Sequence, residues 1–259
     1  MFVDLIDDSQ DELEANLAVP FVPTEDDVIE AMLEVAGVNS KDLLYDLGCG
    51  DGRIVVKAAL DHKASAVGID MDPRRIDEAK EYASWNGADQ MVTFINDDIF
   101  CAEISEATVV TMYLLQSVNL RLRPRLLSEL QPGTRIVSHD FDMGAWEPDR
   151  RVEVGDARVF FWIVPADVEG VWGWTDQQGR HFEVELQQEF QHIRGRAWLN
   201  DRPAELLKAE LRGPRVKLTI QTPEQPRGEV FSARYKDGQL HSKPHAWIKA
   251  HDGRTLSLP

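Results

Sequence analysis

Apolar residues in the first two thirds of the chain alternate between two patterns. Short apolar runs predict five strands, at residues 43–47, 66–70, 91–95, 107–113 and 134–140. Apolar residues spaced three and four apart predict helices at residues 24–36, 53–60 and 73–85, and another from residue 117. This alternation predicts a doubly wound, parallel α/β sheet, closed by a hairpin of residues 151–154 and 159–164.

Several helix ends carry specific signals. Residues 19–23 contain two prolines and are expected to be extended, and Thr24 then has the character of an N-cap. Phe21 and Thr24 are also candidates for a lid over a bound ligand, the alternative being that they only begin the helix. Ser117 is a candidate cap for the later helix, which Pro124 is expected to divide because proline donates no backbone hydrogen bond.

The pattern changes after Pro165. Short runs rich in β-branched and aromatic residues lie at residues 168–175, 181–189, 193–199, 205–211, 216–221, 229–235 and 246–250. Turn signals separate them roughly every 8–12 residues, which predicts a small antiparallel β domain, a meander or barrel, over residues 166–259. The α/β domain takes residues 1–165, of which the acidic residues 1–18 are expected to be loosely ordered.

Charge divides the chain at the same place. The sequence has 45 acidic and 28 basic residues, a net charge of −17. Residues 1–165 hold 32 acidic and 14 basic side chains, whereas residues 166–259 hold 13 and 14. The first domain is therefore expected to repel phosphate backbones and anionic lipids and to favour a cationic or neutral ligand. We expect no nucleic-acid partner.

Composition also bears on the compartment. No apolar run reaches the ~18–20 residues that cross a bilayer, and the first residues lack a signal-peptide pattern. Cys49 and Cys101 have neither disulfide nor metal-ligand spacing. These features predict a cytoplasmic protein with no membrane segment and no metal site.

A glycine-rich loop, Asp46-Leu47-Gly48-Cys49-Gly50-Asp51-Gly52, follows the first predicted strand. Its glycines allow a sharp turn and let a ligand approach the backbone closely. Asp70 ends the second strand, about 20 residues further on, where an acidic residue of a nucleotide-binding sheet accepts hydrogen bonds from ribose hydroxyls. The first inference is therefore a ligand that contains adenosine.

The spacing of this loop distinguishes two ligand classes. A dinucleotide fingerprint has the form G-x-G-x-x-G and faces a pyrophosphate, whereas this loop reads G-x-G-x-G and is followed by Arg53. Asp46 and Asp51 flank the glycines, which disfavours a pyrophosphate and favours a ligand with an ammonium and a sulfonium. Both features favour S-adenosylmethionine (SAM) over NAD.

With these motifs the chain resembles the class I SAM-dependent methyltransferases, a family with a Rossmann-like sheet, over about residues 19–165. The glycine loop matches the first motif of that family, and Asp70 matches its acidic second motif. The resemblance implies that Asp98 binds adenine N6, that Ile99 packs against the ring and that Asp46 lies near the methionine amino group. Asp97 competes with Asp98 for that role. The remaining predicted cofactor-binding residues are Gly48, Gly50, Asp51 and Thr24.

A narrower resemblance lies in residues 19–24, in Asp-Leu-Gly-x-Gly-Asp-Gly-Arg-Ile-Val at residues 46–55, and in residues 135–138 before Phe141. It is shared with the group that contains the mitochondrial lysine methyltransferases of the adenine nucleotide translocase and ATP synthase c subunit, and their bacterial relatives. The mitochondrial members carry an N-terminal membrane segment and lack a β-rich tail. This resemblance implies an amine acceptor, in the first place a protein lysine.

Residues for the acceptor chemistry are expected beyond the carboxyl ends of the fourth and fifth strands. Tyr113 lies at the end of the fourth strand, His139 and Asp140 lie at the end of the fifth, and Asp142 follows it. Such side chains can orient an amine and accept its proton. The alternatives are that Tyr113 packs on adenine or the core and that His139 and Asp140 cap the next segment. Residues 112–115 lack the Asn-Pro-Pro-Tyr-like motif of enzymes that methylate adenine, which argues against a nucleobase acceptor.

In the β domain, four tryptophans either line a pocket or fill the core: Trp172, Trp174, Trp198 and Trp247. His241 and His245 are separated by Pro244 and are not expected to form a metal pair. We expect this domain to serve substrate recognition or another interaction.

The leading prediction is a SAM-dependent methyltransferase with a cationic protein or small-molecule acceptor. The rivals are a small-molecule methyltransferase, an NAD-dependent oxidoreductase and a SAM-binding protein without catalysis. The sequence leaves the acceptor and the oligomeric state open.

Overall fold

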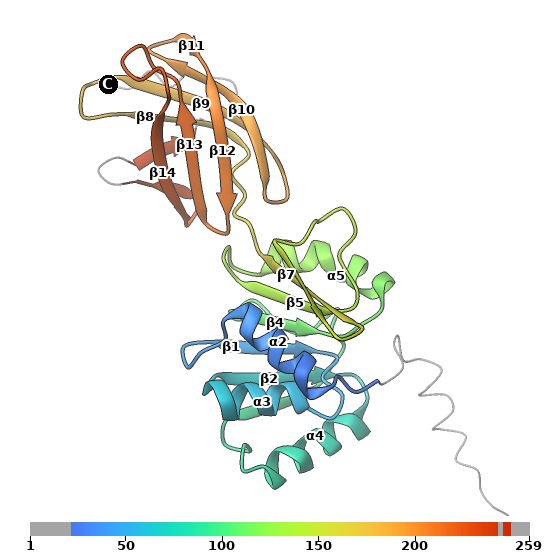
Figure 1. Cartoon of the computed structure of the whole chain (residues 1–259). Coiled ribbons are helices and arrows are strands. Elements are labelled where there is room, and N and C mark those ends of the chain that lie inside the picture. The colour runs from blue at the N-terminus through green and yellow to red at the C-terminus, as the bar shows by residue number, and fades with distance from the viewer. Residues whose placement is uncertain (1–21, 243–245, 250–259) are drawn as a thin grey trace, which may run out of the picture. The chain divides into compact units, whose positions relative to one another are not determined.

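The computed structural model describes residues 22–242 and 246–249 (Figure 1). The chain divides into two compact units between Trp162 and Ile163, close to the boundary expected from the sequence. Residues 1–18, Phe21 and His245 lie outside the described residues. Each unit is built on its own β-sheet.

The first unit is a seven-stranded sheet in the order β3-β2-β1-β4-β5-β7-β6. Its parallel strands are β1 (Leu43–Leu47), β2 (Ser65–Asp70), β3 (Val92–Asn96), β4 (Val109–Met112) and β5 (Arg135–His139). An antiparallel hairpin of β6 (Arg150–Val154) and β7 (Ala157–Ile163) completes the sheet. The predicted Rossmann-like α/β fold is confirmed.

From residue 22 onward, four helices accompany this sheet: α2 (Asp26–Ala36), α3 (Arg53–His62), α4 (Pro73–Trp85) and α5 (Gln116–Glu129). α2 packs against α3, and α3 against α4 (Figure 1). The helical spacing read in α2 is borne out, because Ile29, Met32 and Leu33 are fully buried. This apolar face fixes α2 on the sheet and places residues 22–24, which precede it, beside the carboxyl ends of the strands.

The predicted cap of α2 is wrong. The helix begins after Glu25, whose side chain makes no capping hydrogen bond. Thr24 lies one position too early to cap, and its buried hydroxyl instead faces His139, with 3.4 Å between Thr24 Oγ1 and His139 Nδ1. The Thr24 side chain therefore makes a tertiary contact with His139 instead of the local helix cap that the sequence pattern predicted.

The predictions for α5 are also wrong in two respects. The helix begins after Leu115 rather than at Ser117, and Pro124 lies inside it without dividing it. Proline removes one hydrogen bond from the helical ladder. Here the buried residues Leu122 and Leu126, on both sides of the proline, anchor the helix across that gap.

The second unit is a nine-stranded antiparallel sheet in the order β11-β10-β9-β8-β16-β15-β14-β13-β12. Its strands are β8 (Gly170–Thr175), β9 (His181–Glu189), β10 (His192–Leu199), β11 (Arg202–Ala204), β12 (Leu206–Arg212), β13 (Arg215–Ile220), β14 (Glu229–Lys236), β15 (Gln239–His241) and β16 (Ala246–Lys249). β12 also packs against β10, so the sheet curls into a nearly closed barrel. The predicted small antiparallel β domain is confirmed.

Aromatic rings fill the interior of this barrel. Trp172, Trp174 and Trp247 are buried, whereas Trp198 is half-buried. The rings of Trp174 and Trp247 stack with centroids 4.3 Å apart, and those of Trp174 and Phe182 with centroids 5.3 Å apart. Of the two roles weighed for these tryptophans, core packing describes the three buried ones.

We expect Trp174→Ala to destabilise the second unit by about 3–5 kcal/mol, because it leaves a cavity in this aromatic stack. Scanning calorimetry of the whole chain should show the transition of the second unit at lower temperature and that of the first unit unchanged. Trp198→Ala, from the half-buried tryptophan of β10, is the matched control and should shift the transition much less. An equal shift of both units would contradict separate cores.

Candidate active site

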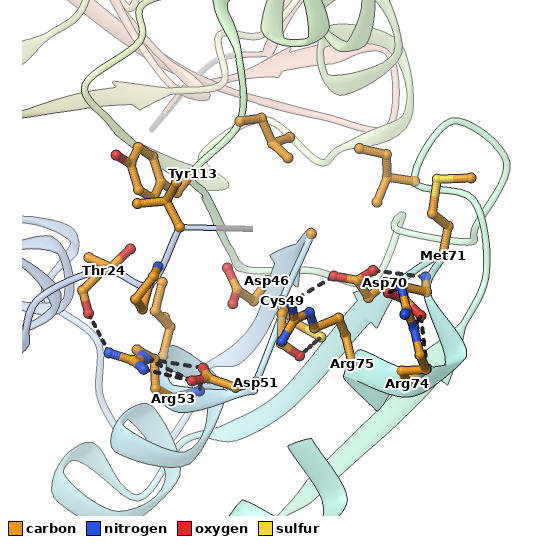
Figure 2. A pocket seen from close by; sticks show the side chains of 18 of the residues that line it. Thr24, Asp46, Cys49, Asp51, Arg53, Asp70, Met71, Arg74, Arg75 and Tyr113 are labelled. Atoms are coloured by element: carbon orange, nitrogen blue, oxygen red, sulfur yellow. Dashed lines mark hydrogen bonds and ion pairs between the residues drawn. The ribbon is translucent and has the colours of Figure 1, made fainter. Parts of the chain in front are cut away.

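A pocket of about 490 Å³ lies beyond the carboxyl ends of the parallel strands in the first unit (Figure 2). Small-molecule sites typically measure about 300–1,000 Å³. Asp46 of β1, Asp70 of β2 and Tyr113 after β4 all line it. They become neighbours because β1 pairs in parallel with both β2 and β4.

The floor of the pocket is the glycine loop between β1 and α3. Gly48, Gly50 and Gly52 have φ angles of 78°, 53° and 78°, which favour glycine. A Cβ atom on Gly48 would lie 2.7 Å from Cδ2 of Leu114, which is itself part of the pocket wall. The loop therefore leaves bare backbone where a ligand can approach closely.

Asp70 is held in one orientation by two backbone donors. Its Oδ2 accepts from the Gly50 N–H (2.9 Å) and its Oδ1 from the Asp72 N–H (2.9 Å) (Figure 2). Burial raises the pKa of Asp70, while these donors act in the opposite direction. Each oxygen keeps a further lone pair, so the carboxylate can accept hydrogen bonds from two adjacent hydroxyls, as ribose presents them.

Asp46 is a buried carboxyl group at the end of β1, with 2% of its surface exposed. The Thr111 hydroxyl of β4 donates to its Oδ1 at 2.8 Å. Burial raises the pKa of Asp46 to about 7, and the charges of Asp70 and Asp51 add to this effect against the Thr111 hydrogen bond. A bound cation would offset this cost, so the group is suited to face an ammonium.

The structure separates the two neighbouring acids after β3. Asp98 and Ile99 line the pocket, whereas Asp97 is absent from its lining. Asp97 accepts a hydrogen bond from the Asp98 N–H (2.8 Å), and Asp98 accepts one from the Phe100 N–H (2.8 Å). Asp97 thus shapes the turn that presents Asp98.

Arg53 ties the glycine loop to the segment before α2. Its Nη2 lies 2.6 Å from Asp51 Oδ2, and its Nη1 donates to the Thr24 carbonyl at 3.1 Å (Figure 2). Val22, Pro23 and Thr24 line the pocket beside this contact. Asp51 therefore lines the pocket while its carboxylate forms an ion pair with Arg53.

Tyr113, His139 and Asp140 contact one another in that order, and the row leads away from the pocket. The rings of Tyr113 and His139 stack with centroids 3.8 Å apart, and Asp140 Oδ2 lies 3.5 Å from His139 Nε2. Burial lowers the pKa of His139, against the pull of Asp140, and so favours the neutral ring. Burial and Asp140 raise the pKa of Tyr113, which keeps its hydroxyl protonated. Of the three, Tyr113 alone lines the pocket.

The second carboxylate oxygen of Asp140 accepts a hydrogen bond from the main chain. Asp140 Oδ1 accepts from the Arg158 N–H at 2.8 Å. Asp142 accepts from Gln116 Nε2 (2.6 Å) and from the Gly144 N–H (2.8 Å). The alternative that Asp140 caps a neighbouring segment therefore applies to one of its two oxygens. The segment that this oxygen binds is β7 and not the one that directly follows Asp140. Asp142 shapes its own loop.

Sequence reasoning missed several residues of the site. Arg125 of α5 donates to the Ile99 carbonyl at 2.6 Å and to the Ala102 carbonyl, and so holds the turn that carries Asp98. Phe100 and Met71 line the pocket as well. Met71 directly follows a predicted strand and Phe100 directly follows the nominated Ile99, so a signal was present for both. Nothing near Arg125 in the sequence indicates its partners.

These features fit SAM: a bare glycine backbone, a fixed acid for ribose and a buried acid for an ammonium. The ANTKMT methyltransferase domain matches residues 46–150. A protein-lysine N-methyltransferase of Saccharolobus islandicus is 46% identical over 142 residues, which are 54% of this chain and 88% of that protein. The chain belongs to the ANTKMT methyltransferase family. It is a SAM-dependent methyltransferase.

Two further proteins are similar to part of this methyltransferase. The mouse adenine nucleotide translocase lysine N-methyltransferase is 31% identical over 57% of the chain, which spans 64% of that enzyme's length. The crystal structure of an RNA methyltransferase from Salinibacter ruber in complex with S-adenosyl-L-homocysteine is 52% identical, with a TM-score of 0.56. It covers 57% of this chain and 96% of that one.

Within residues 22–242 and 246–249, no helix of the methyltransferase has the length and apolar character of a membrane span. Over the same residues, no group of three or more histidine, cysteine, aspartate or glutamate side chains is arranged to hold a metal ion.

We expect Asp46→Asn to weaken SAM binding by about 10- to 100-fold, the worth of a hydrogen bond to a charged group. The same change should raise the melting temperature of the ligand-free protein, because it removes a buried carboxylate. Calorimetric titration and thermal unfolding measure the two effects. Asp61→Asn, at the single acid of α3, whose side chain is 53% exposed, is the control for charge. Unchanged SAM affinity in Asp46→Asn would contradict this role.

The Asp46 pKa of about 7 also predicts that SAM affinity and the stability of the fold depend on pH. SAM affinity of the wild type should rise between pH 6 and 8 as Asp46 loses its proton, and this rise should be absent in Asp46→Asn. Because the folded pKa lies above the unfolded one, Asp46 favours folding at low pH, and this contribution is lost as the pH rises through 7. Titrations and melting curves at matched pH test both statements. An unchanged pH profile in Asp46→Asn would assign the titration to another group.

Proposed function

We propose that the methyltransferase transfers the methyl group of SAM to the side-chain amine of a protein lysine. The observation that carries this proposal is the 46% identity with a protein-lysine N-methyltransferase over 88% of that protein's length. The acidic first unit supports it, because a lysine side chain arrives as a cation.

The proposed SAM site uses the carboxylates of Asp46, Asp70 and Asp98. Asp70 binds the ribose hydroxyls, and Asp46 faces the methionine ammonium. Asp98 accepts a hydrogen bond from adenine N6, and Ile99 packs on the ring. The backbone of Gly48 and Gly50 lies against the ligand, and Asp51 acts through Arg53 to keep Thr24 at the wall of the site.

When bound, SAM supplies a methyl group on a positively charged sulfur, and one in-line displacement forms the N–C bond as the S–C bond breaks. The acceptor nitrogen must first be neutral, its proton leaving to water. We assign to the Tyr113 hydroxyl the role of orienting that nitrogen by accepting one of its hydrogen bonds. His139 and Asp140 are then positioning residues, because His139 stacks behind Tyr113 and Asp140 contacts His139.

RNA is the second candidate acceptor, because the Salinibacter ruber protein with 52% identity carries that substrate class in its name. Two features of this chain speak against it. Residues 112–115 read Met-Tyr-Leu-Leu and offer no carbonyl-proline platform for a planar base. The surplus of acidic side chains in residues 1–165 opposes the approach of phosphates.

The acceptor can be identified by incubating the purified protein and trideuteromethyl SAM with an extract of cells that lack the enzyme. We expect the label on ε-methyllysine in acid-hydrolysed protein, and none with Asp70→Ala. Label confined to nucleosides would establish the RNA alternative. Label confined to low-mass compounds would establish a small-molecule acceptor.

Substitutions at Tyr113 and His139 test the assigned roles once the acceptor is in hand. Tyr113→Phe should lower kcat by about 10- to 100-fold with SAM affinity unchanged, because the amine loses its orientation. His139→Ala should lower kcat, and His139→Phe, which keeps a stacked ring, should restore most of it. An inactive His139→Phe would instead assign a proton-transfer role to the imidazole. Trp85→Ala, at a side chain 81% exposed, is the control.

A further inference from the structure

The outer face of β12–β15 carries a row of basic side chains. Arg212 of β12 lies opposite Arg215 of β13, Arg215 opposite Arg234 of β14, and Arg234 opposite His241 of β15. Residues directly opposite on antiparallel strands share one face. Three arginines and a histidine, all exposed, therefore stand in one line across four neighbouring strands.

Little negative charge accompanies this row. Strand alternation also places Lys208, Lys217 and Lys236 on the outer face of these strands, against a single acid, Glu210. Glu210 lies 2.8 Å from Lys208 Nζ. Among the residues that the structure describes, no carboxylate lies within ion-pair distance of the three arginines of the row.

The β9–β10 side of the same barrel is built differently. Arg196 of β10 lies directly opposite Glu185 of β9 and forms an ion pair of 2.5 Å with it. Arg194 lies opposite Gln187 and donates to its side-chain oxygen at 3.2 Å. On this side each arginine therefore faces an acceptor rather than another cation.

Like charges placed directly opposite one another destabilise a sheet, so packing of the barrel does not account for the row. A polyanion bound along it would remove the repulsion. The row also lines a groove of about 490 Å³, together with Lys217, the hydroxyl residues Ser232 and Ser242, and the single acid Glu210. Arginine forks and hydroxyls are the groups that hold phosphate oxygens.

The shape of the row favours a nucleic acid over an acidic peptide. Four strands at about 4.8 Å spacing carry cations over roughly 14 Å, which is long enough for several phosphates of one strand. Extended peptides are commonly taken up at a sheet edge, whereas this row crosses the face. The groove lining contains no phenylalanine, tyrosine or tryptophan on which a base can stack, and His241 supplies its one imidazole ring.

We propose that the outer face of β12–β15 binds nucleic acid through its sugar–phosphate backbone, without preference for base sequence. The proposal concerns the second unit and does not depend on which acceptor the first unit methylates. It differs from the expectation of no nucleic-acid partner, which was drawn from the surplus of acidic side chains in residues 1–165.

Fluorescence anisotropy of labelled, mixed-sequence 20-nucleotide RNA and DNA tests the proposal on the whole chain between 50 and 300 mM KCl. If three to four phosphates are neutralised, log K should fall with log salt with a slope of about −2 to −3. We expect Arg215→Gln/Arg234→Gln to weaken binding at least tenfold at 50 mM KCl and to reduce the slope by about 1.4. RNA and DNA arms that differ would identify which backbone is preferred.

Arg194→Gln/Arg196→Gln is the matched control, since it removes the same charge from the other side of the barrel and should change binding less than twofold. An equal loss in both variants, no binding by the wild type, or full competition by polyglutamate would overturn the proposal. Melting curves give a second readout. Arg215→Gln/Arg234→Gln should melt at or above the wild-type temperature because repulsion is relieved, and a lower melting temperature would show the arginines to be structural.

Discussion

The parallel pairing of β1 with β2 and β4 is the constraint on which the site depends. Leu47 lies opposite both Ile69 and Met112, so the three strands end at one level. In the same register Asp46 lies beside Thr111, whose hydroxyl it needs, and beside Gly68, where a Cβ would lie 2.8 Å from Cys49 Sγ. A shift by one residue would turn Asp46 to the opposite face of the sheet.

Local patterns in the sequence were enough to predict the parallel strands of the first unit and the glycine loop, because each lies within a few residues of its own signal, whereas the short strands β11 and β15 were not predicted. The environment of Thr24 was not predictable in that way. Its hydroxyl meets His139, 115 residues away, and only the order of the sheet brings the two together. Arg125 reaches the turn after β3 through the same kind of long-range contact. The sequence therefore indicated which ligand class to expect but not what holds its site in place.

The distribution of charge over the second unit was likewise not predictable from the sequence. Residues 166–259 hold 13 acidic and 14 basic side chains, and that near balance suggested a neutral domain. Strand register sorts those charges. Arg196 meets Glu185 on one side of the barrel, while Arg215 meets Arg234 on the other. Counting residues along the chain cannot show such a separation, because neighbours across a sheet are distant in sequence.

The burial of Asp46 has a consequence for the heat of cofactor binding. With a pKa of about 7, the ligand-free enzyme near neutrality carries a proton on this carboxyl group in a large share of its molecules. A methionine ammonium beside the group would drive that proton off. Taking up SAM would thus acidify the solution, and the binding enthalpy would change with the ionisation heat of the buffer. In the molecules that carry this proton, the enzyme would exchange one cation for another in the same place.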